Sequence, residues 1–208
     1  MGTIVPGVFV EPNEIVTNNR IKLSQTTEQN RHKQPNNYKI VWIIRYKSVT
    51  EDLDAWNSNI RSKAAIRTSD TRHFVDPSIG TASLGLGPKD LINDLDSFGL
   101  IFEDMAVRDL RVFAEALDGK LYHYRDSSGL ECDTVLHRRN GTYGLIEVKL
   151  GGEKLINDGA DALNTLADTI DTTKMKKPSF KMVLTAVGPY AYQRPDGIFV
   201  VPIGCLKD

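Results

Sequence analysis

The sequence predicts an α/β domain in which a central mixed sheet is flanked by helices. Apolar residues recur at three-to-four spacing over residues 98–117 and 153–170, which is typical of helices with one buried face. Between and after these segments the pattern changes to short runs of period two, which is typical of strands. From residue 98 onward the predicted order is helix, three strands, helix, strand and strand.

Residues 1–47 differ from the rest, and we expect a polar arm there, followed by one domain over residues 48–208. Asn13 to Asn37 is rich in Asn, Gln and Thr and poor in large apolar residues. Ile40–Ile44 is apolar and predicts a strand that needs burial. Its partner strand could belong to the same domain or to a second copy, and the second arrangement would form a homodimer through the arm.

The first elements of the domain are short. Arg72–Val75 predicts a strand, and Asp76-Pro77 predicts a turn that ends it. Pro88 is expected to open a short helix that runs to Leu95, since proline is favoured at a first helical position. The longer helix over residues 98–117 is followed by Gly119, which we expect to be its C-terminal cap.

The sheet is predicted from the segments that follow. Asn140-Gly141 lies between two period-two runs and is a strong hairpin signal. Gly151-Gly152 ends the run, and the helix over residues 153–170 begins there. The predicted strands are Leu121–Tyr124, Leu130–His137, Tyr143–Leu150, Lys181–Ala186 and Ile198–Ile203.

Composition limits the classes of function. The chain has 208 residues, with no apolar run near the roughly 20 residues that span a bilayer, and no secretion signal is expected. Two cysteines make no disulfide framework, so we expect a reducing, cytoplasmic location. The net charge of −1 counts mildly against an obligate nucleic-acid partner. Basic residues are nevertheless clustered, in His137-Arg138-Arg139 and in Lys174, Lys176, Lys177 and Lys181.

Charged residues at two-residue spacing mark the predicted hairpin. Glu131 and Asp133 share one face of their strand, and Glu147 and Lys149 share one face of the next. Isolated charges in an apolar hairpin are costly unless they are paired or bind metal. Carboxylate oxygens suit Mg²⁺ or Mn²⁺, so Asp133 and Glu147 are candidate ligands. An internal salt-bridge network without an ion is the alternative.

The register of the hairpin decides whether these carboxylates can meet. With a two-residue turn at Asn140-Gly141, Asp133 would oppose Val148, and Glu147 would point to the other face. With a three-residue loop and Gly141 in the left-handed bulge position, Asp133 opposes Glu147, and Glu131 opposes Lys149. The metal hypothesis requires the second geometry, or an equivalent bulge elsewhere in the hairpin. It predicts that the Asp133 and Glu147 carboxylates lie within about 6 Å of each other.

Glu103 on the predicted helix is followed by Asp133 and then by Glu147 and Lys149 on successive predicted strands. In this order the chain resembles the PD-(D/E)xK nuclease superfamily, which includes restriction endonucleases and Holliday-junction resolvases. Residues 52–57, 72–77, 98–103, 122–125, 131–133, 146–149 and 194–197 more closely resemble the C-terminal domain of unknown function of prokaryotic AAA-type ATPases. The resemblance implies a PD-(D/E)xK core with Asp133, Glu147, Lys149 and the helical Glu103 as catalytic residues. Asp133, Glu147 and Glu103 would be the metal ligands, and Glu131 a supporting residue around them.

Two functions are expected from this resemblance. The first is a Mg²⁺- or Mn²⁺-dependent phosphodiesterase acting on DNA. The second is a catalytically silent module that binds an ATPase, another protein partner or nucleic acid. The glycine-rich stretch 80–87 lacks the Gly-Lys-Ser/Thr ending of a phosphate-binding loop, so we expect no ATP site. Possible nucleic-acid contacts are Tyr122, Tyr124, Arg125, Arg138 and Arg139.

Overall fold

The computed structural model describes residues 49–57 and 66–207. These residues all belong to one unit, Pro35–Asp208. The predicted arm, its strand at Ile40–Ile44 and the dimer expected from that strand lie outside the described residues. None of the helices in the described part of the chain is long and apolar enough to cross a membrane.

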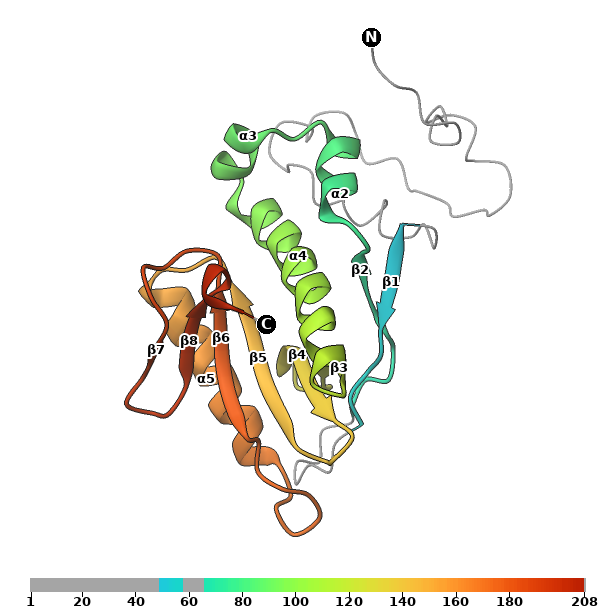
Figure 1. The fold of residues 1–208 in the computed structure, drawn as a ribbon, viewed down its shortest axis with the longest axis vertical. Coiled ribbons are helices and arrows are strands. Elements are labelled where there is room, and N and C mark those ends of the chain that lie inside the picture. The colour runs from blue at the N-terminus through green and yellow to red at the C-terminus, as the bar shows by residue number, and fades with distance from the viewer. Residues whose placement is uncertain (1–48, 58–65, 208) are drawn as a thin grey trace, which may run out of the picture. The chain divides into compact units, whose positions relative to one another are not determined.

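A mixed six-stranded sheet forms the centre of the domain (Figure 1). Its strand order is β3-β4-β5-β6-β8-β7. The first three strands pair antiparallel, while β5, β6 and β8 run parallel. The strands are β3 (Gly119–Arg125), β4 (Glu131–Arg138), β5 (Tyr143–Lys149), β6 (Phe180–Thr185), β7 (Tyr192–Gln193) and β8 (Phe199–Pro202).

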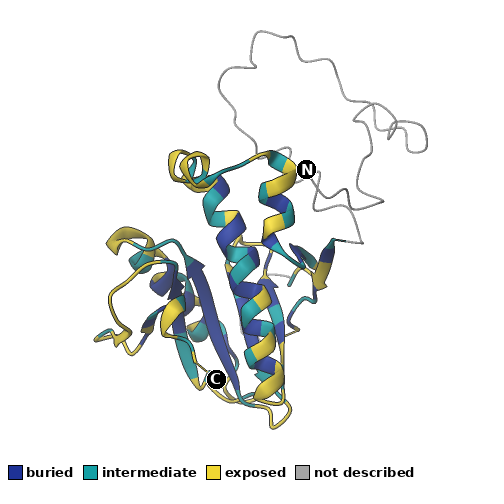
Figure 2. Cartoon of the chain, turned by 45° about the horizontal axis from the view of Figure 1, so that its top comes forward, coloured by how far each residue is buried: buried dark blue, intermediate teal, exposed yellow. Residues whose placement is uncertain are grey.

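Two helices cover the two faces of this sheet. Helix α4 (Leu95–Ala116) packs against Leu121, Leu136, Ile146 and Val148 on one face. Helix α5 (Glu153–Thr169) packs against residues of the other face, including Val135 and Leu145. Because both faces are covered, six of the seven residues of β5 are buried. The strand is dark blue over most of its length in Figure 2. The predicted α/β architecture with a mixed sheet is confirmed at this level.

The region before α4 contains elements that the sequence did not predict. Strand β1 (Thr50–Leu53) pairs antiparallel with β2 (Thr71–Phe74). The predicted turn at Asp76-Pro77 is instead the start of helix α2 (Pro77–Leu84), and the Asp76 carboxylate caps it by accepting from the Ser78 amide at 2.9 Å. Helix α3 (Pro88–Asn93) follows as predicted. After β8 comes a single 3-10 turn, Ile203–Cys205.

The predicted cap of the long helix is displaced by two residues. Leu117 is the C-cap of α4, the left-handed residue is Asp118 at φ 54°, and Gly119 already belongs to β3. Glycine is favoured at 119 for a different reason. A Cβ there would lie 3.1 Å from the His137 carbonyl oxygen, so the close approach of β3 to β4 leaves little space for a side chain.

The hairpin between β4 and β5 has the three-residue loop that the metal hypothesis requires. The Gly141 amide bonds to the Arg138 carbonyl at 2.9 Å, and the Arg138 amide bonds to the Thr142 carbonyl at 2.9 Å. Gly141 has φ +78° and closes the loop in the left-handed region, where glycine is unstrained. The resulting ladder pairs Thr134 with Ile146, so the next pair in register is Asp133 with Glu147.

Candidate functional site

The candidate site lies where β4 and β5 part. Their ladder ends at Thr134 and Ile146; beyond it, Cys132 and Glu131 pair with β3 while Glu147 to Lys149 pair with β6. The divergence has a local cause in β4, because Asp133 and Thr134 both face His123 of β3, which makes a β-bulge. The His123 amide and carbonyl bond instead to Asp54 and Trp56.

Where β4 and β5 diverge, two side chains of β4 form hydrogen bonds with the backbone of β5. We call this divergence the fork. The Val148 amide donates to Asp133 Oδ2 at 2.8 Å. The Cys132 thiol donates to the Ile146 carbonyl at 3.4 Å. Cys132 is buried in the cluster under α5, and burial raises the pKa of its thiol well above the usual value. Cys132 therefore has a structural role, whereas Asp133 still presents its carboxylate to neighbouring charges.

Lys149 links the two carboxylates. Its Nζ lies 2.5 Å from Glu147 Oε2 and 3.3 Å from Asp133 Oδ2. The two oxygens therefore cannot be farther apart than these distances added together, which confirms the predicted limit of about 6 Å. The side chains are 5% (Glu147), 17% (Asp133) and 25% (Lys149) exposed, so the cluster is shielded but remains open to solvent at Lys149.

Burial and the neighbouring charges shift the pKa values of Glu147 and Lys149. Burial raises the pKa of Glu147 to about 8, and the Asp133 charge adds to the rise although Lys149 opposes it. Burial alone would lower the pKa of Lys149, but the charges of Asp133 and Glu147 outweigh it and raise the pKa above its usual value. Lys149 is therefore a cation at neutral pH, whereas Glu147 is mostly protonated.

Gly159 lets α5 approach this cluster. A Cβ at this position would lie 3.4 Å from Glu147 Cβ and 3.5 Å from Lys149 Cγ. A larger side chain would meet the stem of Lys149 and move its ammonium. A glycine in the interior of a helix lowers its stability. Gly159 within the periodic segment 153–170 therefore indicated a close approach of another element, which was not predicted from the sequence.

Glu103 approaches from α4. It is half-buried, and its carboxylate forms no hydrogen bond or ion pair with another described residue. Burial raises the pKa of its carboxyl well above the usual value, and Asp133 is the charge that adds most to the rise. Glu103 and Lys149 both line a cleft of about 770 Å³ between the first turns of α4 and the carboxyl ends of β5 and β6. Glu103 therefore lies beside Lys149 at the candidate site, and its role there stays a prediction.

The walls of this cleft are mostly apolar, which the sequence analysis did not anticipate. Its charged lining residues are Asp96, Glu103 and Lys149. Several apolar lining residues are exposed, among them Leu95 (60%) and Val187 (68%). Apolar side chains contributed to the cleft are Leu95, Phe98, Leu100, Val148, Leu150, Leu155, Ala186 and Val187.

The donor chemistry fits a hard divalent cation only in part. Carboxylate oxygens of Asp133 and Glu147 are suitable ligands, and the Thr185 hydroxyl, beside Lys149 in the β5–β6 register, is buried without a hydrogen-bond partner among the described residues. Within the described ranges, however, no three His, Cys, Asp or Glu side chains are grouped closely enough to hold an ion. Binding would require Lys149 to withdraw and Glu103 or water to complete the ligands.

Glu131 does not join the cluster. It is exposed and pairs with Arg125 of β3, with Arg125 Nε and Glu131 Oε1 2.8 Å apart. The expected opposition of Glu131 and Lys149 is wrong because the bulge at Asp133 and Thr134 carries the start of β4 away from β5. Glu131 therefore has no supporting contact to the candidate ligands.

The five residues predicted to contact nucleic acid do not form one surface. Tyr124 is 1% exposed, and its hydroxyl donates to Asp126 at 3.0 Å, so the prediction is wrong for this residue. Arg125 is engaged with Glu131. The remaining three, Tyr122, Arg138 and Arg139, line a pocket of about 580 Å³ at the other end of β4 from Asp133.

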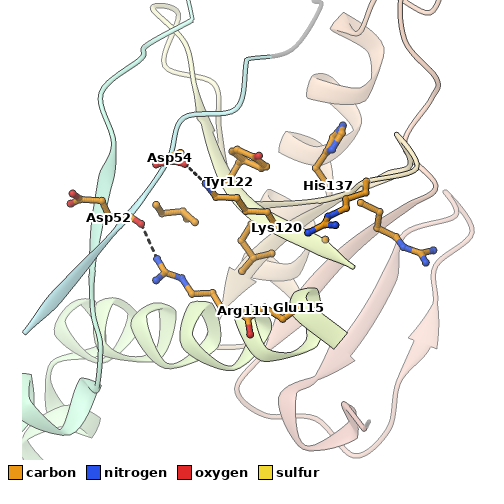
Figure 3. A pocket seen from close by; sticks show the side chains of 12 residues that line it. Asp52, Asp54, Arg111, Glu115, Lys120, Tyr122 and His137 are labelled. Carbon is orange, nitrogen blue, oxygen red and sulfur yellow. Dashed lines mark hydrogen bonds and ion pairs between the residues drawn. The ribbon is translucent and has the colours of Figure 1, made fainter. Parts of the chain in front are cut away.

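Opposite charges balance each other in that pocket (Figure 3). Lys120 bonds to Asp54 at 2.5 Å, and Arg111 of α4 donates to the Asp52 carbonyl at 3.1 Å. Its acidic lining residues are Asp52, Asp54 and Glu115, and its basic ones are Arg111, Lys120, Arg138 and Arg139. The pocket by itself therefore offers little excess positive charge to a polyanion.

A buried His–Asp pair next to Glu103 was also missed. His73 of β2 and Asp104 of α4 share a hydrogen bond of 2.9 Å between Nδ1 and Oδ1. The Phe74 amide also donates to Asp104, at 3.3 Å. This pair fixes β2 to α4 one residue from Glu103. Asp104 follows Glu103 in the sequence and lies on the buried face of α4.

Comparison with known families extends these observations. Residues 98–206 match the family described as Domain of unknown function (DUF4143). The chain belongs to this family. The DUF4143 region includes Glu103, Asp133, Glu147 and Lys149, and it leaves out β1, β2, α2 and α3. No curated protein and no solved structure matches the chain. The resemblance to an uncharacterised domain is supported, while its nuclease core remains a prediction.

Proposed function

We propose that the cleft at the end of β5 catalyses metal-dependent hydrolysis of phosphodiesters in DNA, on a PD-(D/E)xK core. One observation carries this proposal. Asp133 and Glu147 meet in the fork between two strands, with Lys149 Nζ in contact with both carboxylates. The fork lies at the carboxyl end of a parallel strand, beside a cleft that Lys149 and Glu103 line. Ligands commonly bind α/β sheets at such an edge.

In this proposal Asp133 and Glu147 hold a Mg²⁺ or Mn²⁺ ion, and Glu103 completes the oxygen ligands. The ion would lower the pKa of a bound water and offset charge on the phosphate. Glu147 must lose its proton to serve as a ligand, because only the carboxylate form binds a cation. Its pKa of about 8 implies that the ion competes with a proton near neutral pH.

Lys149 acts as a cation in this site. The raised pKa of its ammonium argues against a role as general base at neutral pH. If an ion offset the charges of Asp133 and Glu147, the Lys149 ammonium would be free to turn toward the cleft that it lines. There Nζ can donate to a phosphate oxygen and stabilise the negative charge that develops on it.

Nicking of supercoiled plasmid with Mn²⁺ tests this function. Wild-type protein should convert supercoiled to open-circular DNA, and Asp133→Asn and Glu147→Gln should each lose the activity. Glu131→Gln is a matched control, since it removes a carboxylate from the same strand outside the cluster. Activity that survives Asp133→Asn indicates contamination, and inactivity on all DNA forms contradicts the proposal.

A second candidate is favoured by the apolar walls of the cleft. A polyanion would be expected to meet several Lys or Arg side chains, yet Lys149 is the basic lining residue of this cleft. Exposed Leu95, Leu155 and Val187 are more typical of a protein contact. In this alternative the domain is a catalytically silent module that binds an ATPase or another protein partner. Loss of that association in Leu95→Ser and Leu155→Ser, in a protein without nicking activity, would support it.

A further inference from the structure

Two basic segments that are far apart in the sequence meet at the end of the sheet opposite the cleft. One is the tip of the β4–β5 hairpin, with Arg138 and Arg139, and the other is the loop 171–179 between α5 and β6. Tyr143 joins them, because its hydroxyl donates to the Lys176 carbonyl at 2.6 Å and its carbonyl accepts from the Ser179 amide at 2.7 Å. We call Arg138, Arg139, Lys174, Lys176 and Lys177 the basic end.

We propose that the basic end binds the phosphate backbone of duplex DNA and holds the substrate of the cleft. The proposal rests on the proposed function and adds a second contact for the same substrate. It also specifies the class of substrate, because a contact far from the cleft favours a long duplex over a short oligonucleotide.

Cations outnumber their acidic contacts at the basic end. Lys174 pairs with Asp171 at 3.4 Å, and Arg139 pairs with Asp118 at 3.0 Å. The Lys174 and Arg139 side chains are 63% and 84% exposed, so these ion pairs are weak and can be exchanged for phosphate. Lys176 and Lys177 are exposed and form no ion pair with any residue in the described ranges. Positive charge is therefore concentrated here in a chain whose net charge is −1.

Local hydrogen bonds hold both segments in place. In the loop, Asp171 Oδ1 accepts from the Thr173 amide at 3.1 Å, and the Asp171 carbonyl accepts from the Lys174 amide at 3.0 Å. At the hairpin tip, Asn140 Oδ1 accepts from the Thr142 amide at 2.9 Å. Because the backbone is already ordered, binding a rigid polyanion loses less conformational entropy than it would with free loops.

Duplex DNA fits these observations better than an anionic membrane. Basic segments that bind membranes usually add exposed apolar side chains that enter the lipid. None of the large apolar side chains that are exposed in the described part of the chain lies in 138–142 or 171–179. The surface thus offers charge without an apolar anchor, which is typical of a contact to phosphate.

The distance between the two sites sets a length for the substrate. The six steps along β5 from Tyr143 to Lys149 span roughly 20 Å, at about 3.3 Å per residue. B-DNA rises 3.4 Å per base pair, so a linear duplex that contacts both sites must extend roughly six base pairs beyond the reacting phosphate. Single nucleotides and very short duplexes cannot make both contacts.

Salt-dependent binding of a 20-base-pair duplex in EDTA tests the proposal with the full chain. Lys176→Gln with Lys177→Gln should weaken binding about tenfold at low salt. It should also reduce the slope of log affinity against log salt by about 1 to 2, since each phosphate contact contributes about 0.9. Lys89→Gln with Lys154→Gln removes the same charge from exposed positions elsewhere and should change affinity less than about twofold.

The outcomes separate this inference from the proposed function. Equal affinity and slope for the wild type and both double variants would overturn it, as would an absence of duplex binding or binding to anionic vesicles alone. If plasmid nicking persists in such a case, the proposed chemistry stands without the basic end. If nicking is absent but Lys176→Gln with Lys177→Gln selectively weakens duplex binding, the basic end stands and the proposed chemistry fails.

Discussion

The amide of Val148 donates its hydrogen bond to the carboxylate of Asp133, 2.8 Å away, at the point where the main-chain ladder between β4 and β5 has ended. One carboxylate therefore has two tasks. It satisfies a buried strand amide, and it forms an ion pair with Lys149, whose Nζ lies 3.3 Å away.

These two tasks can be separated by substitution. Asp133→Ala leaves the Val148 amide without an acceptor and should lower the free energy of unfolding by about 1–3 kcal/mol. Asp133→Asn keeps an acceptor oxygen and should cost about 1 kcal/mol less, while it still removes the charge. Urea unfolding of both variants measures the difference. Equal losses would show that the amide contact adds nothing to stability.

Glu147 should make the protein less stable as the pH rises. Its pKa is about 8 in the folded state against an ordinary value of 4.5, so between these values the folded state holds a proton that the unfolded state has released. Stability linked to this proton is present below about pH 4.5 and is lost as the pH rises toward 8. Glu147→Gln should remove this decline. Unfolding at pH 5, 6, 7 and 8 measures it, and parallel curves for the two proteins would contradict the expectation.

Divalent cations should stabilise the fold if the carboxylates bind them. An ion at one hundred times its dissociation constant adds about 2.7 kcal/mol to the free energy of unfolding. The gain should be larger at pH 8 than at pH 6, because Glu147 must be deprotonated to bind. Thermal melts with millimolar Mn²⁺ and with EDTA measure it. Glu147→Gln should abolish the shift and Glu131→Gln should retain it, whereas identical melts for the wild type would count against an ion site.

Gly159 should tolerate a methyl group but not a longer side chain. Gly159→Ala gains helix propensity of about 1 kcal/mol, and its Cβ meets Glu147 Cβ at 3.4 Å, near the limit of ordinary contact. The net change in stability should therefore be small. Gly159→Leu collides with the stem of Lys149 and should cost about 1–3 kcal/mol through overpacking. It should also change the Mn²⁺ response. A Gly159→Leu variant as stable as wild type would show that α5 does not press on the cluster.

The sheet and its two covering helices could be predicted because each has a strong period. Strand β5 and helices α4 and α5 agree with the predicted segments within three residues at each end. The loop of the β4–β5 hairpin could be narrowed to two alternatives, since Gly141 permits the left-handed conformation in only a few turn types. The choice between them required the structure.

Features that depend on contacts between distant residues could not be predicted. Asp76-Pro77 was read as a turn, although these two residues are the N-cap and the first residue of helix α2. Gly80 is required there by the Phe74 ring, which a Cβ would meet at 2.9 Å. The separation of Glu131 from Lys149 follows from the bulge opposite His123, and that bulge depends on backbone bonds from Asp54 and Trp56. The local sequence of β4 does not predict these hydrogen bonds.

The three-residue loop of the β4–β5 hairpin limits how many residues can be inserted or deleted in the segment 139–141. Removing or adding one residue in 139–141 would turn Glu147 and Lys149 to the opposite side of their strand unless a second irregularity compensated. Adding or removing two would preserve their orientation. Relatives that keep the carboxylate cluster should therefore differ in this loop by even numbers of residues, and an odd difference would mark a lineage that has lost the cluster or rebuilt the fork.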